Sequence, residues 1–224
     1  DALKVNKSKY ELENAHPIHQ AFMQLDITKE LGRDEVRNVV LPAYMGLIKE
    51  IDDNLSRVMS ELKNLNLLEN TMIVFTADHG DYLGDHWVGE KELFHQESVK
   101  VPLIIIDPSE YANNTRNKQC NDFVEAIDLL PTFLDFLNIP IETNVIEGQS
   151  LLPYLNGNKI QMREFVYSEL DFNFYDIQQY LNVAKSPKGY MIQTHQWKYV
   201  YFTNLRPMLF NLKEDPHELV DLGA

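Results

Sequence analysis

The sequence predicts an α/β fold that ends in a small antiparallel sheet. Two short apolar runs, residues 72–75 and 101–106, are typical of strands buried on both faces of a largely parallel sheet. Between residues 33 and 65 apolar side chains recur at spacings of three and four, which predicts a long amphipathic helix. This helix precedes the strand at 72–75, so together they form the helix–strand half of an α/β unit.

The predicted long helix contains two features that need interpretation. Pro42 is expected to kink the helix or split it in two. Asp52 and Asp53 are adjacent carboxylates, but neighbouring side chains on a helix diverge by about 100°. They cannot both face one metal, and we interpret them as a solvated face with one structural contact.

The segments flanking this region predict packing rather than chemistry. Residues 1–30 are polar and are expected to be irregular, with His16 and His19 as surface or packing residues. A further helix is expected over residues 123–137.

The composition of the sequence changes from Arg163 onward. Short aromatic-rich segments separated by Pro, Gly and Asn predict strands of an antiparallel sheet, with the aromatic side chains in core or cross-strand packing. These segments are residues 164–170, 189–194, 197–202 and 207–212. We therefore divide the chain into an α/β part, 1–160, and a small antiparallel-sheet subdomain, 161–224.

Composition excludes several classes of function. The formal charge of −14 argues against a nucleic-acid partner, which requires a basic surface, and against attraction to anionic membranes. No apolar run is long enough to span a membrane. The single cysteine permits no internal disulfide, so a cytoplasmic location is favoured over a periplasmic one.

A candidate metal site follows the first predicted strand. Asp78 and His79 come directly after the apolar run, where α/β sheets place their ligands, and Gly80 allows a sharp turn. An adjacent carboxylate and imidazole can hold one divalent cation. Each residue also has a structural alternative, since Asp78 could cap a helix and His79 could donate to a carbonyl.

An ordered set of motifs across this region resembles the sulfatase branch of the alkaline phosphatase superfamily, most closely the phosphonate monoester hydrolase and arylsulfatase group. The motifs are Asp78-His79-Gly80, Leu83-Gly84-Asp85-His86, Gly89-Glu90-Lys91 and Val101-Pro102-Leu103-Ile104. The resemblance extends over residues 36–222. It implies an alkaline-phosphatase-like mixed, largely parallel sheet with flanking helices, followed by the small antiparallel sheet.

The resemblance also implies roles for individual residues. Asp78 and His79 would bind the metal, and Lys91 would be catalytic by neutralising charge on the substrate oxygens. Asp85 and His86 are expected to order the loop around the metal without ligating it. The histidine at position 79, where many arylsulfatases have Asn, makes Mn²⁺ credible beside Ca²⁺.

The nucleophile of this family is a formylglycine made from the first residue of Cys/Ser-x-Pro-x-Arg. Cys120 is followed by Asp122 and Val124, so the pattern is absent there, and no serine matches it. This chain therefore contains no nucleophile. The formylglycine and the remaining metal ligands are expected in a missing N-terminal half.

The resemblance predicts that the chain is the C-terminal portion of a metal-dependent hydrolase of sulfuric, phosphonate or phosphoric esters. The partners would be a small anionic ester and, in a possible homo-oligomer, further copies of the protein. One alternative is a two-metal phosphodiesterase of the same superfamily, against which the Lys91 loop and the segment 215–218 argue. The other is an inactive fragment or interaction module, and inactivity is expected for this chain alone.

Overall fold

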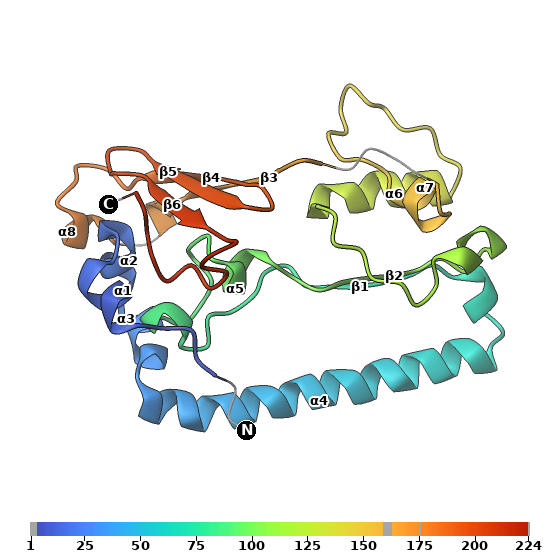
Figure 1. Cartoon of the computed structure of the whole chain (residues 1–224). Helices are drawn as coiled ribbons and strands as arrows, with labels where there is room; N and C mark the ends of the chain where they lie inside the picture. The colour runs from blue at the N-terminus through green and yellow to red at the C-terminus, as the bar shows by residue number, and fades with distance from the viewer. Residues whose placement is uncertain (1–3, 159–162, 175, 224) are drawn as a thin grey trace. The chain divides into compact units, whose positions relative to one another are not determined.

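The computed structural model describes residues 4–158, 163–174 and 176–223 of the chain (Figure 1). The residues form two compact units, described separately below. The first unit comprises residues 1–53, 76–102 and 167–224, and the second comprises residues 54–75 and 103–166. The boundary expected at residue 160 stays a prediction.

The long helix expected over residues 33–65 is confirmed as α4 (Asp34–Asn64), which contributes to both units (Figure 1). Its first turn carries Asp34 and Glu35, whose charges favour the positive end of the helix dipole. The helix continues through Pro42 as one element and is not split. Asp53 forms an ion pair with Lys49 one turn away, and both carboxylates of the Asp52–Asp53 pair belong to exposed residues, as expected for a solvated face.

The expectation that residues 1–30 are irregular is wrong. They contain α1 (Lys9–Asn14), α2 (Pro17–Phe22) and α3 (Asp26–Lys29). These helices are too short to show a 3.6-residue periodicity, and local caps define their starts. Ser8 Oγ accepts from the Glu11 N–H (3.0 Å), and Pro17 occupies the first turn of α2.

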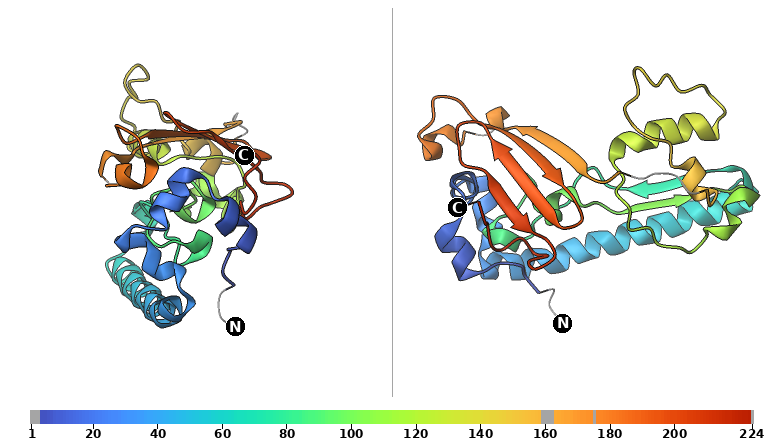
Figure 2. Two further views of the ribbon diagram at one scale, coloured as in Figure 1. Left: turned by 90° about the vertical axis from the view of Figure 1, so that its left-hand side faces the viewer. Right: turned by 45° about the horizontal axis from the view of Figure 1, so that its top comes forward.

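The sheet of the first unit confirms the four predicted C-terminal strands. They are β3 (Val166–Asp171), β4 (Lys188–Gln193), β5 (Trp197–Phe202) and β6 (Met208–Asn211), in that spatial order (Figure 2). The β4–β5 and β5–β6 pairs are antiparallel. Along β5 exposed and buried residues alternate, so one face of the sheet faces the core and the other carries exposed aromatic residues.

The core of the first unit joins the N-terminal helices to this sheet. Ile18 and Phe22 from α2 pack in one apolar cluster with Val200 and Phe202 from β5. The short helices α5 (Gln96–Val99) and α8 (Gln178–Leu181) complete this unit. Burial against the sheet stabilises helices that would not persist alone.

The second unit contains the two central strands. β1 (Ile73–Thr76) and β2 (Leu103–Ile106) confirm the two predicted strands and pair in a two-stranded sheet. A larger, mostly parallel sheet stays a prediction. The helix expected over 123–137 begins later, because residues 126–128 form a 3-10 turn before α6 (Leu129–Phe136).

Short elements complete the described chain. The helix α7 is Leu152–Leu155. The 3-10 helices are η1 (Glu30–Gly32), η2 (Leu68–Asn70), η3 (Asp85–Trp87), η4 (Glu110–Asn114), η5 (Ala126–Asp128) and η6 (Phe172–Phe174). In the described part of the chain, every helix is too short or too polar to cross a membrane.

A buried carboxylate organises the second unit. Asp128 is fully buried, and its two oxygens accept from the two terminal nitrogens of Arg163, each at 2.7 Å. The same carboxylate accepts from the backbone N–H groups of Glu125 and Gln149, both at 2.8 Å. It therefore joins the start of α6 to two later segments of the chain.

We expect Asp128→Ala to lower the free energy of unfolding by about 3 kcal/mol, because it removes the bidentate partner of a largely buried guanidinium. Urea denaturation with a probe in the second unit measures this loss. The control is Asp53→Ala, which breaks an exposed pair and should cost at most about 0.5 kcal/mol. Equal costs for the two variants would contradict the anchoring role of Asp128.

Candidate functional site

The candidate site lies in the loop of residues 77–95 between β1 and α5. Four of its non-glycine residues have a left-handed backbone: Leu83 (φ 47°), His86 (φ 53°), Trp87 (φ 66°) and Glu90 (φ 63°). Such a conformation costs roughly 1–2 kcal/mol per residue. The loop must therefore be held in shape by contacts with the rest of the first unit.

Asp78 and His79 are presented to solvent, with 86% and 42% of their side chains exposed. His79 Nδ1 lies 2.7 Å from the carbonyl oxygen of Gly80, which can only accept, so Nδ1 carries the proton. This leaves the lone pair of Nε2 available for a metal. Nε2 lies 3.5 Å from Asp78 Oδ2, and two ligands of one cation are roughly 3–3.5 Å apart. The pair thus fits the expected divalent metal as part of its ligand set.

Lys91 lies at the far end of the same loop. Its side chain is 40% exposed, and Nζ is 3.4 Å from a carboxylate oxygen of Glu90. Its backbone N–H donates to Glu92 Oε2 (2.8 Å), and its carbonyl oxygen accepts from Ser98 Oγ. The main chain of Lys91 is therefore fixed on both sides while the ammonium group reaches solvent.

Asp81 is a further charged residue at this site, which sequence reasoning did not select. Burial raises the pKa of Asp81; its hydrogen bond from the Leu83 N–H lowers it, the charge of Glu90 raises it, and the charges of His79 and Lys91 lower it. Asp81 thus shares one electrostatic environment with His79 and Lys91. The available signal was its position immediately after Asp78-His79-Gly80.

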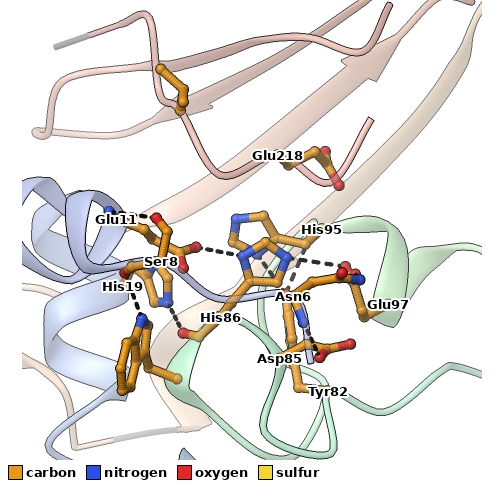
Figure 3. A network of polar contacts seen from close by, with 12 residues as sticks. Asn6, Ser8, Glu11, His19, Tyr82, Asp85, His86, His95, Glu97 and Glu218 are labelled. Carbon is orange, nitrogen blue, oxygen red and sulfur yellow. Dashed lines mark hydrogen bonds and ion pairs between the residues drawn. The ribbon is translucent and has the colours of Figure 1, made fainter. Parts of the chain in front are cut away.

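One residue of this loop, His86, forms a buried ion cluster with Glu11 and Glu97, which we call the His86 cluster (Figure 3). The His86 side chain is fully buried, with Nδ1 2.5 Å from Glu11 Oε1 and Nε2 3.2 Å from Glu97 Oε2. Burial alone would lower the pKa of His86, but the hydrogen bonds and charges of the two carboxylates raise it to about 10. Burial opposes ionisation of Glu97 as well, yet His86 lowers the pKa of Glu97 to about 2. The cluster therefore contains an imidazolium between two carboxylates.

Two further buried histidines surround this cation and remain neutral. Burial and the charge of His86 lower the pKa of His19 to about 3 and that of His95 well below its ordinary value. His19 Nε2 donates to the carbonyl oxygen of His86 (2.6 Å), and His95 Nδ1 lies 2.8 Å from the Tyr82 hydroxyl. His95 is itself buried, which agrees with a structural role.

The residues Glu11, His86 and His95 form a group of three potential metal ligands in the described part of the chain, with ligand atoms within 4.8 Å of one another. However, the His86 and His95 rings are stacked, with centroids 4.0 Å apart and planes at 13°. An imidazole binds a metal in its ring plane, so the lone pairs of two stacked rings cannot converge on one ion. Both nitrogens of His86 also face carboxylates, and the geometry is that of an ion pair.

Asp85 and His86, which were expected to order the loop, both contact the N-terminal segment. The backbone N–H of Asn6 donates to Asp85 Oδ1 (2.7 Å), and the backbone N–H of His86 donates to the carbonyl oxygen of Asn6 (2.8 Å). Burial raises the pKa of Asp85. The metal-supporting role of both residues stays a prediction.

Comparison with known proteins identifies the family of this chain. The family model described as Sulfatase matches residues 7–139. The chain belongs to the sulfatase family. A second model, N-sulphoglucosamine sulphohydrolase, C-terminal, matches residues 84–223 of this sulfatase chain.

Curated relatives of this sulfatase chain include two groups. It is 36% identical over 199 residues to the multifunctional alkaline phosphatase superfamily protein PehA of Trinickia caryophylli, covering 87% of the chain and 38% of the relative. It is 28% identical over 233 residues to arylsulfatase K of Canis lupus familiaris, covering 100% of the chain and 41% of the relative. The sulfatase chain thus spans about two fifths of the length of these relatives.

Solved structures show the same fold. The crystal structure of the phosphonate monoester hydrolase of Agrobacterium radiobacter matches with a TM-score of 0.85 and 28% identity, over 99% of this chain and 47% of that one. The phosphonate monoester hydrolase from Silicibacter pomeroyi matches with a TM-score of 0.80 and 26% identity, over 98% and 46%. The sulfatase chain therefore has the α/β architecture of these hydrolases.

The pKa shifts predict that the free energy of unfolding is greatest near pH 6.5–7. Above the ordinary histidine value of 6.5 the unfolded chain loses a proton that folded His86 keeps up to about pH 10, so stability falls across that interval. One proton contributes a slope of at most about 1.4 kcal/mol per pH unit.

Below pH 6.5 the unfolded chain protonates histidines that stay neutral when folded, such as His19, and stability falls again. Between about pH 4.5 and pH 2 the stabilisation from Glu97 is lost as well.

Urea denaturation between pH 5 and pH 10 measures this profile. His86→Gln should have a flatter alkaline limb than the unsubstituted protein, whereas replacement of the exposed His217 by Gln should leave that limb unchanged. An unchanged alkaline limb in His86→Gln would show that His86 is not the buried cation.

Proposed function

We propose that the whole protein is a metal-dependent hydrolase of sulfuric, phosphonate or phosphoric esters, and that this chain supplies part of its active site. The observation that carries this proposal is the Asp78–His79 pair, in which a solvent-facing carboxylate and a correctly protonated imidazole can bind one cation. Membership of the sulfatase family supports the reaction class.

Each residue of the loop has a specific part in this proposal. Asp78 and His79 would hold the divalent metal, Mn²⁺ or Ca²⁺, which supplies Lewis-acid stabilisation of the anionic ester when bound. Lys91 would offset the negative charge that develops on the ester oxygens, because its ammonium group is accessible and its main chain is fixed. Asp81 would interact electrostatically with His79 and Lys91 and would offset positive charge in this loop.

The nucleophile in this proposal is a formylglycine outside residues 1–224. Cys120 is an exposed thiol with Sγ 3.6 Å from Asp122 Oδ2, and its sequence context lacks the modification motif. Because catalytic groups that act as a unit lose almost all activity when one is missing, residues 1–224 alone should be inactive.

The substrate class in this proposal is a small anionic ester. Two solved relatives are named phosphonate monoester hydrolases, and another, 28% identical over 78% of this chain, is described in complex with D-glucosamine-2-N,6-O-disulfate. The shared feature of these substrates is a tetrahedral centre with anionic oxygens. A metal and an ammonium group recognise that feature irrespective of whether sulfur or phosphorus is at the centre.

We expect Asp78→Ala in the full-length protein to abolish bound metal and hydrolysis together, because it removes the charged ligand. Metal content is measured by elemental analysis and turnover with 4-nitrophenyl sulfate and a phenylphosphonate ester. Asp52→Ala, an exposed acidic residue on α4, is the matched control and should retain both. Full metal content in Asp78→Ala would remove the ligand assignment.

Lys91→Ala should separate catalysis from metal binding. We expect turnover to fall by about 10²–10³-fold, as when a charge-stabilising donor is removed, with metal content unchanged. The neighbouring Lys100, which is exposed, provides the control Lys100→Ala. Unchanged kinetics in Lys91→Ala would exclude the proposed role of its ammonium group.

A further inference from the structure

We propose that the His86 cluster is a positioning device for the metal pair and Lys91, in which His86 and Asn6 fix Glu97 and the neighbouring Ser98 holds both ends of the active-site loop. This inference deepens the proposed function and rests on it. It adds Asn6, Glu11 and Glu97 as residues that act on the site through others.

The first step is the attachment of His86 itself. Its ring is held by Glu11 from α1, and its backbone N–H and carbonyl oxygen bond to Asn6 (2.8 Å) and His19 (2.6 Å). The ring and the backbone of one fully buried residue are therefore fixed by the N-terminal segment. Such support is needed because His86 itself has a left-handed backbone.

In the second step, Glu97 connects the fixed His86 side chain to α5. Both oxygens of the Glu97 carboxylate accept hydrogen bonds. Oε2 accepts from His86 Nε2 (3.2 Å), and Oε1 accepts from Asn6 Nδ2 (3.2 Å). Both carboxylate oxygens are thus engaged, so the Glu97 side chain is held by two partners. Because α5 is a single turn of four residues, holding Glu97 in place also holds the backbone of the adjacent Ser98.

The third step connects α5 to the two ends of the loop. The carbonyl oxygen of Ser98 accepts from the backbone N–H of Gly80 (2.8 Å), and Ser98 Oγ donates to the carbonyl oxygen of Lys91. Gly80 directly follows His79, so one residue of α5 contacts the chain next to the metal pair and at the proposed catalytic lysine.

The backbone contact at Gly80 is unusually close. A Cβ atom added to Gly80 would lie 1.8 Å from the carbonyl oxygen of Glu97. No side chain fits there, so the metal-bearing turn packs directly on the backbone of Glu97. A displacement of Glu97 would therefore move Gly80 and, with it, the Nδ1 partner that sets the tautomer of His79.

The test uses Glu97→Gln in the full-length protein, which keeps the shape of the side chain and removes its charge. Two measurements apply: amide hydrogen exchange of the segment containing Gly80 in the metal-free protein, and Mn²⁺ affinity by calorimetric titration. We expect faster exchange at this segment and an affinity about tenfold weaker, as for other residues that orient metal ligands. Turnover should also fall, although Lys91 itself is not substituted.

The matched control is Glu125→Gln, which alters a similarly buried carboxylate that pairs with Arg163 (2.8 Å) in the second unit. It should lower overall stability without changing Gly80 exchange or Mn²⁺ affinity. If Glu97→Gln does not fold, Asn6→Ala replaces it; this variant removes one bond to Glu97 and should shift both measurements less, in the same direction.

The proposal is overturned if Glu97→Gln, or Asn6→Ala in its place, changes Gly80 exchange and Mn²⁺ affinity no more than Glu125→Gln does. Failure of the proposed function is a separate result, seen when Asp78→Ala keeps its metal. Since exchange at Gly80 is measured without metal or substrate, it tests the positioning role in either case.

Discussion

The loop of residues 77–95 in the first unit depends on the buried imidazolium of His86. The His86 ring has no exposed surface, and it lies between the carboxylates of Glu11 and Glu97, one at each ring nitrogen. Burying such a group costs several kcal/mol unless partners satisfy both ring nitrogens. Few arrangements satisfy these requirements. The cluster therefore fixes how α1, α5 and the loop between β1 and α5 lie relative to one another.

The same enclosure limits what His86 could contribute to the proposed site. Two carboxylates surround the imidazolium and exceed its single positive charge, so the cluster presents no net positive charge to the loop surface. The whole chain is acidic, with a formal charge of −14, and Lys91 lies beside Glu90. An anionic ester would be repelled by this background. Within this chain, Lys91 and the metal proposed at Asp78 and His79 would supply the positive charge that attracts the ester.

Elements with local periodicity were predictable from the sequence, and elements stabilised by distant partners were not. α4, β1, β2 and the four C-terminal strands each carry a repeat of 3.6 or two residues, or a continuous apolar run. The helices α1 and α2 lack such a repeat and depend on caps and on burial of Ile18 and Phe22 against the sheet.

The site shows the same division. Asp78, His79 and Lys91 could be selected because adjacent residue types and motif order carry the information. The partners of His86 could not, since Glu11 precedes it by 75 residues and no sequence pattern marks the pair. The tautomer of His79 was not predictable either, because it is set by a contact to the carbonyl oxygen of Gly80.

The long sequence separation of these contacts has a consequence for folding. Glu11 and Asn6 lie 75 and 79 residues before their partners His86 and Asp85, so bringing them together closes a long loop of chain and costs entropy before it yields contacts. The left-handed residues of the loop also disfavour its early formation. We expect local elements such as the β4–β5 hairpin and α4 to form first, and the loop of residues 77–95 to acquire its shape only in a late step. During synthesis, α1 and α2 are made before α5 and the sheet. They can therefore pack in their final positions only after these later elements have been synthesised.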